Sequence, residues 1–247
     1  MQTTHTPWLW RCQLAALALS SLAVLTFRGQ WLGWRPALLA NAFFLTTVVL
    51  IGFVSLLILF AKLRSGSQLG GTRHCLLATA LSLPVLIGIL MLGMRGAKVP
   101  PIHDISTDTL NPPAFTSAAN QRRPGDNPVG YAGAELAKQQ QQAYADIAPL
   151  LSPLPPAQAV ERCLAVAKTM NWQIIAQERD KGLIEAVDRS RIFGFLDDIV
   201  LRITAHEGGS RIDLRSASRV GVSDLGVNAE RIRRFSHQFN ASPGPRP

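Results

Sequence analysis

Three long apolar runs occupy the first part of the chain, at residues 8–27, 37–60 and 75–94. The middle run contains no charged residue, Arg11 lies near the start of the first, and Pro84 lies inside the third. About 20 apolar residues are enough for a helix to cross the roughly 30 Å hydrocarbon core of a bilayer. A proline is tolerated in such a helix because neighbouring helices satisfy the carbonyl that it frees. The pattern therefore predicts three transmembrane helices within residues 8–94.

A proline-rich segment follows the apolar runs, at residues 95–156. Proline fixes φ and lacks a backbone donor, so most of this segment is predicted to be extended chain and turns. Residues 132–144 are predicted to form one short helix, with the glutamine run at 139–142 on its solvent face. The segment thus separates the predicted membrane helices from the rest of the chain.

Residues 157–240 carry the pattern of a compact domain, in which two helical segments flank four alternating ones. Strands are predicted at residues 172–179, 183–188, 198–205 and 211–218. This order predicts an α+β domain: an antiparallel sheet of about four strands, with an N-side helix and a C-terminal helix covering one face. The alternation of apolar and polar positions predicts that the other face is exposed to water.

The last helix carries its own start signal and an apolar stripe. Asn228 is expected to be the N-cap, because an asparagine side chain accepts hydrogen bonds from the free backbone N–H groups of a first turn. Phe235 and Phe239 share the stripe that we expect to dock on the sheet. The wet face of this helix is predicted to carry Arg231, Arg233 and Arg234. Residues 241–247 are predicted to be a disordered tail.

The last two strands are predicted to form a hairpin whose register follows from charge. One register sets Arg202 opposite Asp213 across a four-residue loop, and a second sets Arg202 opposite Arg215. Opposite charges across a strand pair stabilise it by roughly 0.2–1 kcal/mol, whereas like charges destabilise it. We therefore expect the Arg202–Asp213 register, and we expect Arg215 to pair with Asp198 on the same face.

The formal charge of +9 is unevenly distributed, since every acidic residue follows Met94. The few basic residues before that point flank the apolar runs, as in membrane proteins with short basic loops. This distribution argues against nucleic-acid binding as the reason for the charge. The flanking basic residues tie at four on each side, but the loop at 61–73 is the most basic single loop. It favours an inside amino terminus and a C-terminal domain outside.

Polar residues near the ends of the last two strands form the candidate site, expected at the rim of the sheet. The set consists of Asp198, Arg202, Arg215, Ser218, Arg219 and Asp224. Asp197 precedes Asp198, but neighbours in a strand point to opposite faces and cannot easily share one ligand. Structural ion pairs are the competing explanation for the same residues.

No catalytic motif accompanies this set, since the sequence lacks GxSxG, HExxH, P-loop and CxxC patterns. His103, Asp104 and Asp108 are of metal-binding type, but their spacing fits no ligand pattern on a helix face. Neither a metal site nor a cofactor is therefore expected. Cys163 is expected to be a small buried residue rather than a nucleophile.

Four longer motifs carry a family resemblance. They are P-P-I-H-D-I-S-T-D-T-L-N-P-P-A-F at 100–115, A-Y-A-D-I-A-P-L at 143–150, F-G-F-L-D-D-I-V-L-R at 193–202 and R-S-A-S-R-V-G-V-S-D-L-G-V-N-A-E-R-I-R at 215–233. In this order they resemble the uncharacterised family called domain of unknown function fourteen-ninety-nine, over most of residues 100–240; Ala145 stands where that family would have proline. The resemblance implies an exported or membrane-anchored domain, and it supplies no activity, substrate or catalytic residue.

Two functions of different classes fit the sequence. The first is a membrane-anchored envelope protein of the bacterial inner membrane, whose periplasmic domain binds a partner protein, a lipid or a small ligand. The second is a membrane-bound hydrolase or metal-dependent enzyme that uses the polar rim of the sheet. A deep pocket that collects the candidate residues would favour the enzyme, and their dispersal would favour the binding protein.

Overall fold

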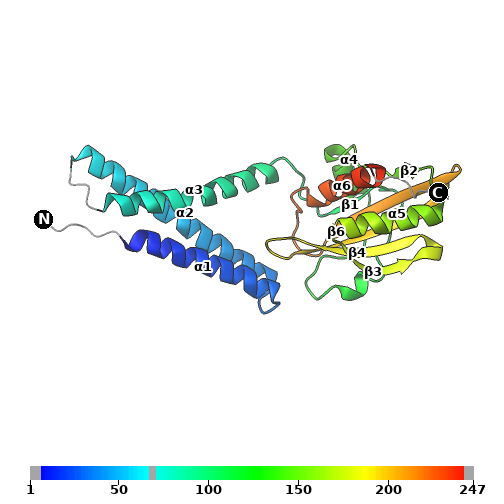
Figure 1. Cartoon of the computed structure of the whole chain (residues 1–247), viewed down its shortest axis with the longest axis horizontal. Coiled ribbons are helices and arrows are strands. Elements are labelled where there is room, and N and C mark those ends of the chain that lie inside the picture. The colour runs from blue at the N-terminus through cyan, green and yellow to red at the C-terminus, as the bar shows by residue number, and fades with distance from the viewer. Residues whose placement is uncertain (1–6, 67–70, 242–247) are drawn as a thin grey trace. The chain divides into compact units, whose positions relative to one another are not determined.

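The computed structural model describes residues 7–66 and 71–241, which form two compact units: the first ends at Arg95 and also includes Ile192–Gly194, and the second comprises the rest of the described chain from Gly96. The first unit contains three long helices, α1 (Trp8–Arg28), α2 (Trp34–Arg64) and α3 (Thr72–Gly96) (Figure 1). Each is long and apolar enough to cross a membrane. The three predicted apolar helices are therefore confirmed, and each extends beyond its predicted bounds at one or both ends.

Polar side chains connect the three helices of this unit. The Gln13 side-chain amide donates to the carbonyl groups of Val48 and Ala78, both at 2.9 Å. The Asn41 amide donates to the Ser20 hydroxyl at 2.8 Å. Hydrogen bonds of this kind help apolar helices to associate in lipid, where the hydrophobic effect does not drive association.

The second unit is built on one antiparallel sheet of six strands. They are β1 (Asp104–Ser106), β2 (Leu150–Ser152), β3 (Gln173–Glu178), β4 (Leu183–Arg189), β5 (Leu196–His206) and β6 (Gly209–Ser218). The order across the sheet is β1-β6-β5-β4-β3, and β2 also pairs with β6. The predicted fold class is confirmed, and the four predicted strands correspond to β3 to β6. The two additional strands come from the proline-rich segment, and at three residues each they are too short to show an alternating pattern.

The hairpin of β5 and β6 has the register that charge predicted. Arg202 lies opposite Asp213, with 3.0 Å between Arg202 Nη2 and Asp213 Oδ2. The loop is shorter than predicted, because strand pairing continues until only Glu207 and Gly208 connect the strands. Both residues have positive φ, at 41° and 80°, as the tight two-residue turns of hairpins require.

Two helices, α5 (Pro156–Thr169) and α6 (Val227–Ala241), lie side by side on one face of the sheet (Figure 1). Phe235 and Phe239 of α6 are both buried in the core between this face and the helices. The Phe235 ring stacks on Trp172, with 5.5 Å between ring centroids. The predicted docking of the last helix on the sheet is therefore confirmed.

The start of α6 differs from the prediction. Asn228 lies inside the first turn, and it is the Asp224 carboxylate that accepts hydrogen bonds from the backbone N–H groups of Gly226 and Asn228, at 2.8 and 2.7 Å. Asp224 therefore caps the helix in place of Asn228. At the other end Ala241 is still helical, and the rest of the predicted tail lies outside the described residues.

Two polar side chains that were predicted to face water are buried. Arg231 is 2% exposed, and its guanidinium contacts the carboxylates of Asp188 and Asp197. Gln140, in α4 (Ala134–Ala143), donates to the Ser106 carbonyl at 2.7 Å and accepts from the Ser106 N–H at 2.9 Å. Its amide thus satisfies backbone groups of β1 that no neighbouring strand pairs.

The face of the sheet away from α5 and α6 is covered, so the prediction of a wet face is wrong. We call residues 107–131 the cover segment. Phe115 and Ala118 of this segment pack against Val200 of β5 and Ala217 of β6 in a small second core. The physical reason for the covering lies in the charged side chains of this face, which bind backbone groups of the cover segment.

Truncation of Phe235 to alanine is expected to destabilise α6 strongly, because removal of a buried phenylalanine ring costs about 3–5 kcal/mol. The measurement is hydrogen exchange of α6 amides, followed by mass spectrometry, on the full-length protein. Arg234→Ala is the matched control, since Arg234 is exposed on the same helix and should leave the exchange rates almost unchanged. Equal and small effects from both substitutions would contradict the docking.

Candidate functional site

Arg215, on β6, holds the cover segment at two points and β1 at a third. Its Nε and Nη2 donate to the Asp104 carboxylate at 2.9 and 2.7 Å. Nη1 donates to the Pro113 carbonyl at 3.1 Å, and Nη2 donates to the Val129 carbonyl at 2.8 Å. The guanidinium also lies over the Phe115 ring, 4.6 Å from its centroid. Because only 3% of the Arg215 side chain is exposed, these groups replace water almost completely.

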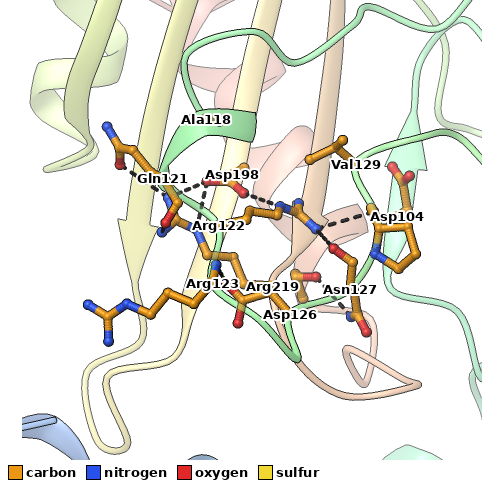
Figure 2. Close-up of polar contacts among 12 residues, drawn as sticks. Asp104, Ala118, Gln121, Arg122, Arg123, Asp126, Asn127, Val129, Asp198 and Arg219 are labelled. Carbon is orange, nitrogen blue, oxygen red and sulfur yellow. Dashed lines mark hydrogen bonds and ion pairs between the residues drawn. The ribbon is translucent and has the colours of Figure 1, made fainter.

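Asp198, on β5, is fully buried and binds two arginines, as the dashed lines in Figure 2 show. Its Oδ1 accepts from Arg219 Nη2 at 2.7 Å, and its Oδ2 accepts from Arg122 Nε at 2.9 Å. Arg122 belongs to the cover segment and also donates to the carbonyl groups of Asn127 and Pro128. One carboxylate therefore joins β5, the chain that leaves β6 and the cover segment.

Glu185, on β4, anchors the middle of the cover segment. Its carboxylate accepts from three successive backbone N–H groups, those of Thr116, Ser117 and Ala118, at 3.0, 2.9 and 2.8 Å. It also accepts from the Thr116 hydroxyl. Hydrogen bonds from several N–H groups stabilise a buried carboxylate and compensate for its lost hydration.

Arg202 lies nearer the hairpin turn on the same face, in a cluster with Arg211, Asp108 and Asp213. Its Nη2 is 3.1 Å from Asp108 Oδ2 and 2.9 Å from the Asn111 carbonyl oxygen. Arg211 Nη2 is 3.1 Å from the same Asp108 oxygen. The hydrogen bond from Arg211 to Asp213 raises the pKa of the Arg211 guanidinium further above its ordinary value. This cluster fixes the start of the cover segment on the sheet.

Ser218 and Asp224 belong to the opposite, helix-covered side. The Ser218 hydroxyl accepts from the Asn228 side-chain amide at 3.0 Å. Burial raises the pKa of the Asp224 carboxyl, while the backbone N–H groups of Asn228 and Gly226 act in the opposite direction. Both candidate residues therefore contribute to the start of α6.

The six sequence candidates do not converge on one pocket. Asp198 and Arg219 form one cluster, while Arg215 and Arg202 belong to two others on the same face. The predicted Arg215–Asp198 pair is wrong. Arg215 forms its ion pair with Asp104, and Asp198 forms ion pairs with Arg122 and Arg219. All six candidates form hydrogen bonds with other protein groups. The arrangement holds separate segments of the chain together.

Sequence reasoning missed four members of these clusters: Asp104, Arg122, Glu185 and Arg231. Each of them binds at least one distant partner: Arg215 for Asp104, Asp198 for Arg122, Thr116 for Glu185 and Asp197 for Arg231, between 34 and 111 residues away in sequence, and no local spacing marks these contacts. The one available signal was the charge pattern of β6, where every second residue from Arg211 to Arg215 is charged. The same pattern is typical of a strand face that is exposed to water, so it does not identify these partners.

An open groove of about 530 Å³ lies at one side of the sheet domain, within the volume range of small-molecule sites. Its apolar wall consists of Pro101, Ile102, Pro128, Ala132, Leu136 and Val222. Its polar lining includes His103, Asp104, Glu135 and Gln139. His103 Nδ1 is shielded from solvent and forms no hydrogen bond with any described protein group. None of the six sequence candidates lines this groove.

Burial raises the pKa of two further side chains, those of Cys163 and Tyr131. Cys163 is buried as expected, and burial raises the pKa of its thiol to about 12, which keeps it protonated at neutral pH. Burial and the nearby Asp104 carboxylate raise the pKa of the Tyr131 phenol to about 12, against the opposing charge of Arg215. Among residues 7–66 and 71–241, no group of three or more His, Cys, Asp or Glu side chains is placed to hold a metal ion.

Fold and site together define a class of protein: an α+β domain with a covered antiparallel sheet that follows three apolar helices. Residues 104–239, more than half of the chain, match the family described as "Protein of unknown function (DUF1499)". The chain belongs to this family, so the resemblance carried by the four motifs is confirmed. A comparison with curated proteins found no match.

Substitution Asp198→Asn is expected to destabilise the sheet domain by about 3–5 kcal/mol, because it leaves two buried arginines without their counter-charge. The same change should release Arg122, so trypsin should cut the Arg122–Arg123 bond faster than in the unsubstituted protein. Denaturant unfolding and timed proteolysis of the full-length protein measure the two effects.

The matched control is Asp146→Asn. Asp146 pairs with Arg233 at 2.6 Å, but its side chain is 56% exposed, and surface pairs contribute only about 0–1 kcal/mol. A loss of stability from Asp198→Asn no greater than that from the control would contradict the anchoring role.

Proposed function

We propose that the chain is a multi-pass integral membrane protein whose sheet domain binds a small amphiphile in the groove beside α4. The observation that carries this proposal is the groove itself, since it combines an apolar wall with the polar residues His103, Glu135 and Gln139. Pockets that are mainly apolar and hold a few polar groups are the usual form of small-ligand sites.

The chemistry of the lining favours a ligand whose head group donates hydrogen bonds or carries positive charge. Two carboxylates, Asp104 and Glu135, line the groove, and Glu135 is exposed. Asp104 is already paired with Arg215, so Glu135 is the carboxylate that remains accessible to a ligand. The side-chain amide of Gln139, which also lines the groove, can accept or donate a further hydrogen bond. An amine or an alcohol on an apolar chain fits this lining.

The membrane supplies the ligand in this proposal. Pro101, which lines the groove, follows Gly96 at the end of α3 by five residues, and five residues span at most about 18 Å. The three helices are the right length and composition for bilayer spans. Molecules that partition into the bilayer are therefore the accessible source of amphiphiles.

We place the protein in the bacterial inner membrane, with the sheet domain on the periplasmic side. Support comes from the loop between α2 and α3, whose flanks carry Lys62, Arg64 and Arg73. Basic loops are retained in the cytoplasm, and three spans put the two ends of the chain on opposite sides.

The enzyme alternative has less support. All six residues of the proposed polar site form hydrogen bonds within the protein, and none of them lines the groove. Catalysis requires side chains that can reach a substrate, so the ion pairs favour a structural role for this set.

Cysteine accessibility tests the orientation. In a Cys12→Ser background, Ser65→Cys and Glu207→Cys place labels in the loop after α2 and in the hairpin turn of the domain. We expect an impermeant maleimide to label Glu207→Cys in spheroplasts and Ser65→Cys only in inverted membrane vesicles. Labelling of both positions from the same side of the membrane would contradict the three-span topology.

Native mass spectrometry of the detergent-solubilised protein tests the groove with decylamine, decanol and decanoate, which share one chain and differ in head group. We expect occupancy to fall in the order amine, alcohol, carboxylate. Ala132→Trp should abolish binding, because the indole fills the groove, whereas Ala134→Trp on the adjacent exposed surface should retain it. Equal binding of decanoate, or unchanged binding to Ala132→Trp, would overturn the proposal.

A further inference from the structure

Arg215 does not line the groove beside α4, but its guanidinium connects two of the groove's walls. The same atom, Nη2, donates to the Asp104 carboxylate at 2.7 Å and to the Val129 carbonyl at 2.8 Å. Asp104 lines the groove from β1. Val129 lies between Pro128 and Gly130, which line the groove from the cover segment. One donor atom therefore fixes the spacing of these two walls.

The third wall, α4, has a separate attachment. Glu135 and Leu136 line the groove from the first turn of this helix, and Leu136 is also buried in the core. Further along the helix, the Gln140 amide binds the backbone of Ser106 in β1, at 2.7 and 2.9 Å. The α4 wall is therefore held in place by contacts that do not involve Arg215.

The two carboxylates of the lining differ in how much charge they present to a ligand. Asp104 accepts from both Nε and Nη2 of Arg215, at 2.9 and 2.7 Å, and the side chains of Asp104 and Arg215 are 5% and 3% exposed. Two opposite charges in bidentate contact largely cancel at the distance of a third group. Glu135 is exposed, and it accepts a hydrogen bond from the neutral amide of Gln139 at 3.3 Å. Glu135 therefore provides the negative charge of the groove.

We propose that Arg215 is a positioning residue that sets the charge selectivity of the groove. By neutralising Asp104 it leaves one effective carboxylate, Glu135, so the groove takes an amphiphile whose head group carries a single positive charge. A dicationic head group gains nothing from the second carboxylate, and an anionic one meets the charge of Glu135. The inference rests on the proposed binding of an amphiphile; it adds the charge of the ligand and a role for a residue that does not touch it.

Native mass spectrometry of the full-length, detergent-solubilised protein tests this role with decylamine, N-decylpropanediamine and decanoate. These ligands share one chain and carry one positive, two positive and one negative charge. In the unsubstituted protein we expect the diamine to bind no better than decylamine, and decanoate to bind worst. Arg215→Gln exposes the charge of Asp104, so it should raise the ratio of bound diamine to bound decylamine about tenfold, as one hydrogen bond to a charged group does.

The reciprocal variant is Asp104→Asn, which leaves the Arg215 guanidinium without its counter-charge. It should raise the ratio of bound decanoate to bound decylamine about tenfold, for the same reason. The double variant Asp104→Asn/Arg215→Gln lacks both charges and should keep both ratios of the unsubstituted protein. A purely structural role of Arg215 would instead weaken all three ligands alike and leave the ratios unchanged in every variant.

Arg211→Gln is the matched control. Arg211 lies on the same strand face as Arg215 and pairs with Asp108 and Asp213, none of which lines the groove. This substitution should leave both ratios unchanged. The charge-state distribution in the same spectra separates folded from unfolded chains, and the ratios are taken from the folded chains.

Glu135→Gln tests the neutralisation of Asp104 without a change to the buried pair, since Glu135 is exposed. It should lower the ratio of bound decylamine to bound decanol about tenfold, because no effective carboxylate remains for the amine. A persistent preference for the amine would mean that Asp104 is available to the ligand. That result overturns the inference even where the two single variants at the buried pair do not fold.

The possible failures are distinguishable. An unsubstituted protein that binds none of the decyl ligands contradicts the proposed function itself. A protein that prefers decylamine, but whose Arg215→Gln and Asp104→Asn variants change the ratios no more than Arg211→Gln does, overturns the role of Arg215 alone. A diamine that binds the unsubstituted protein better than decylamine also overturns that role, since it shows that Asp104 is not neutralised.

Discussion

The buried guanidinium of Arg215 is the constraint on which the sheet domain depends. A charge with 3% of its side chain exposed is stable only if nearby groups replace its hydration, and removal of one such partner costs several kcal/mol. The partners are Asp104, Pro113 and Val129, all of which precede the strands of the main meander in sequence. The four strands and two helices that periodicity identifies are therefore an incomplete unit without the segment before them.

The buried guanidinium of Arg231 also requires charged partners, on the face of the sheet that α5 and α6 cover. Arg231 of α6 contacts Asp188 and Asp197, while Asp198, the next residue, points to the cover segment. Because successive strand residues face opposite sides, a slip of one residue in β5 would turn both carboxylates to the opposite faces and leave one of the two sets of arginines without its partner. The apolar core and two buried charge clusters thus specify one register together, which the apolar pattern alone would fix less strictly.

The sequence predicted what depends on local pattern and missed what depends on distant partners. The alternation of apolar and polar residues and the charges across the strands were enough to predict the Arg202–Asp213 register, since both residues belong to one hairpin. Arg215 was assigned to Asp198 because its true partner lies 111 residues earlier, beyond any local rule. The charged face of β6 was predicted to be exposed to water. A solvated face and a face covered by polar backbone groups show the same alternation of apolar and polar residues, so the sequence does not distinguish them. Asn228 was taken for the cap because its residue type fits, although it is the Asp224 carboxylate that accepts hydrogen bonds from the first-turn backbone.

The charged side chains on the covered face of the sheet bind one another and the backbone, so the function of this domain is better sought elsewhere on its surface. A sheet face whose carboxylates and guanidinium groups are saturated by backbone and by one another offers little to a solute, however polar its composition. The groove beside α4 differs, since its lining includes the exposed carboxylate of Glu135 next to an apolar wall. The charged face of the sheet is thus explained by its role in holding the cover segment, whereas the groove has polar groups that a ligand can still reach.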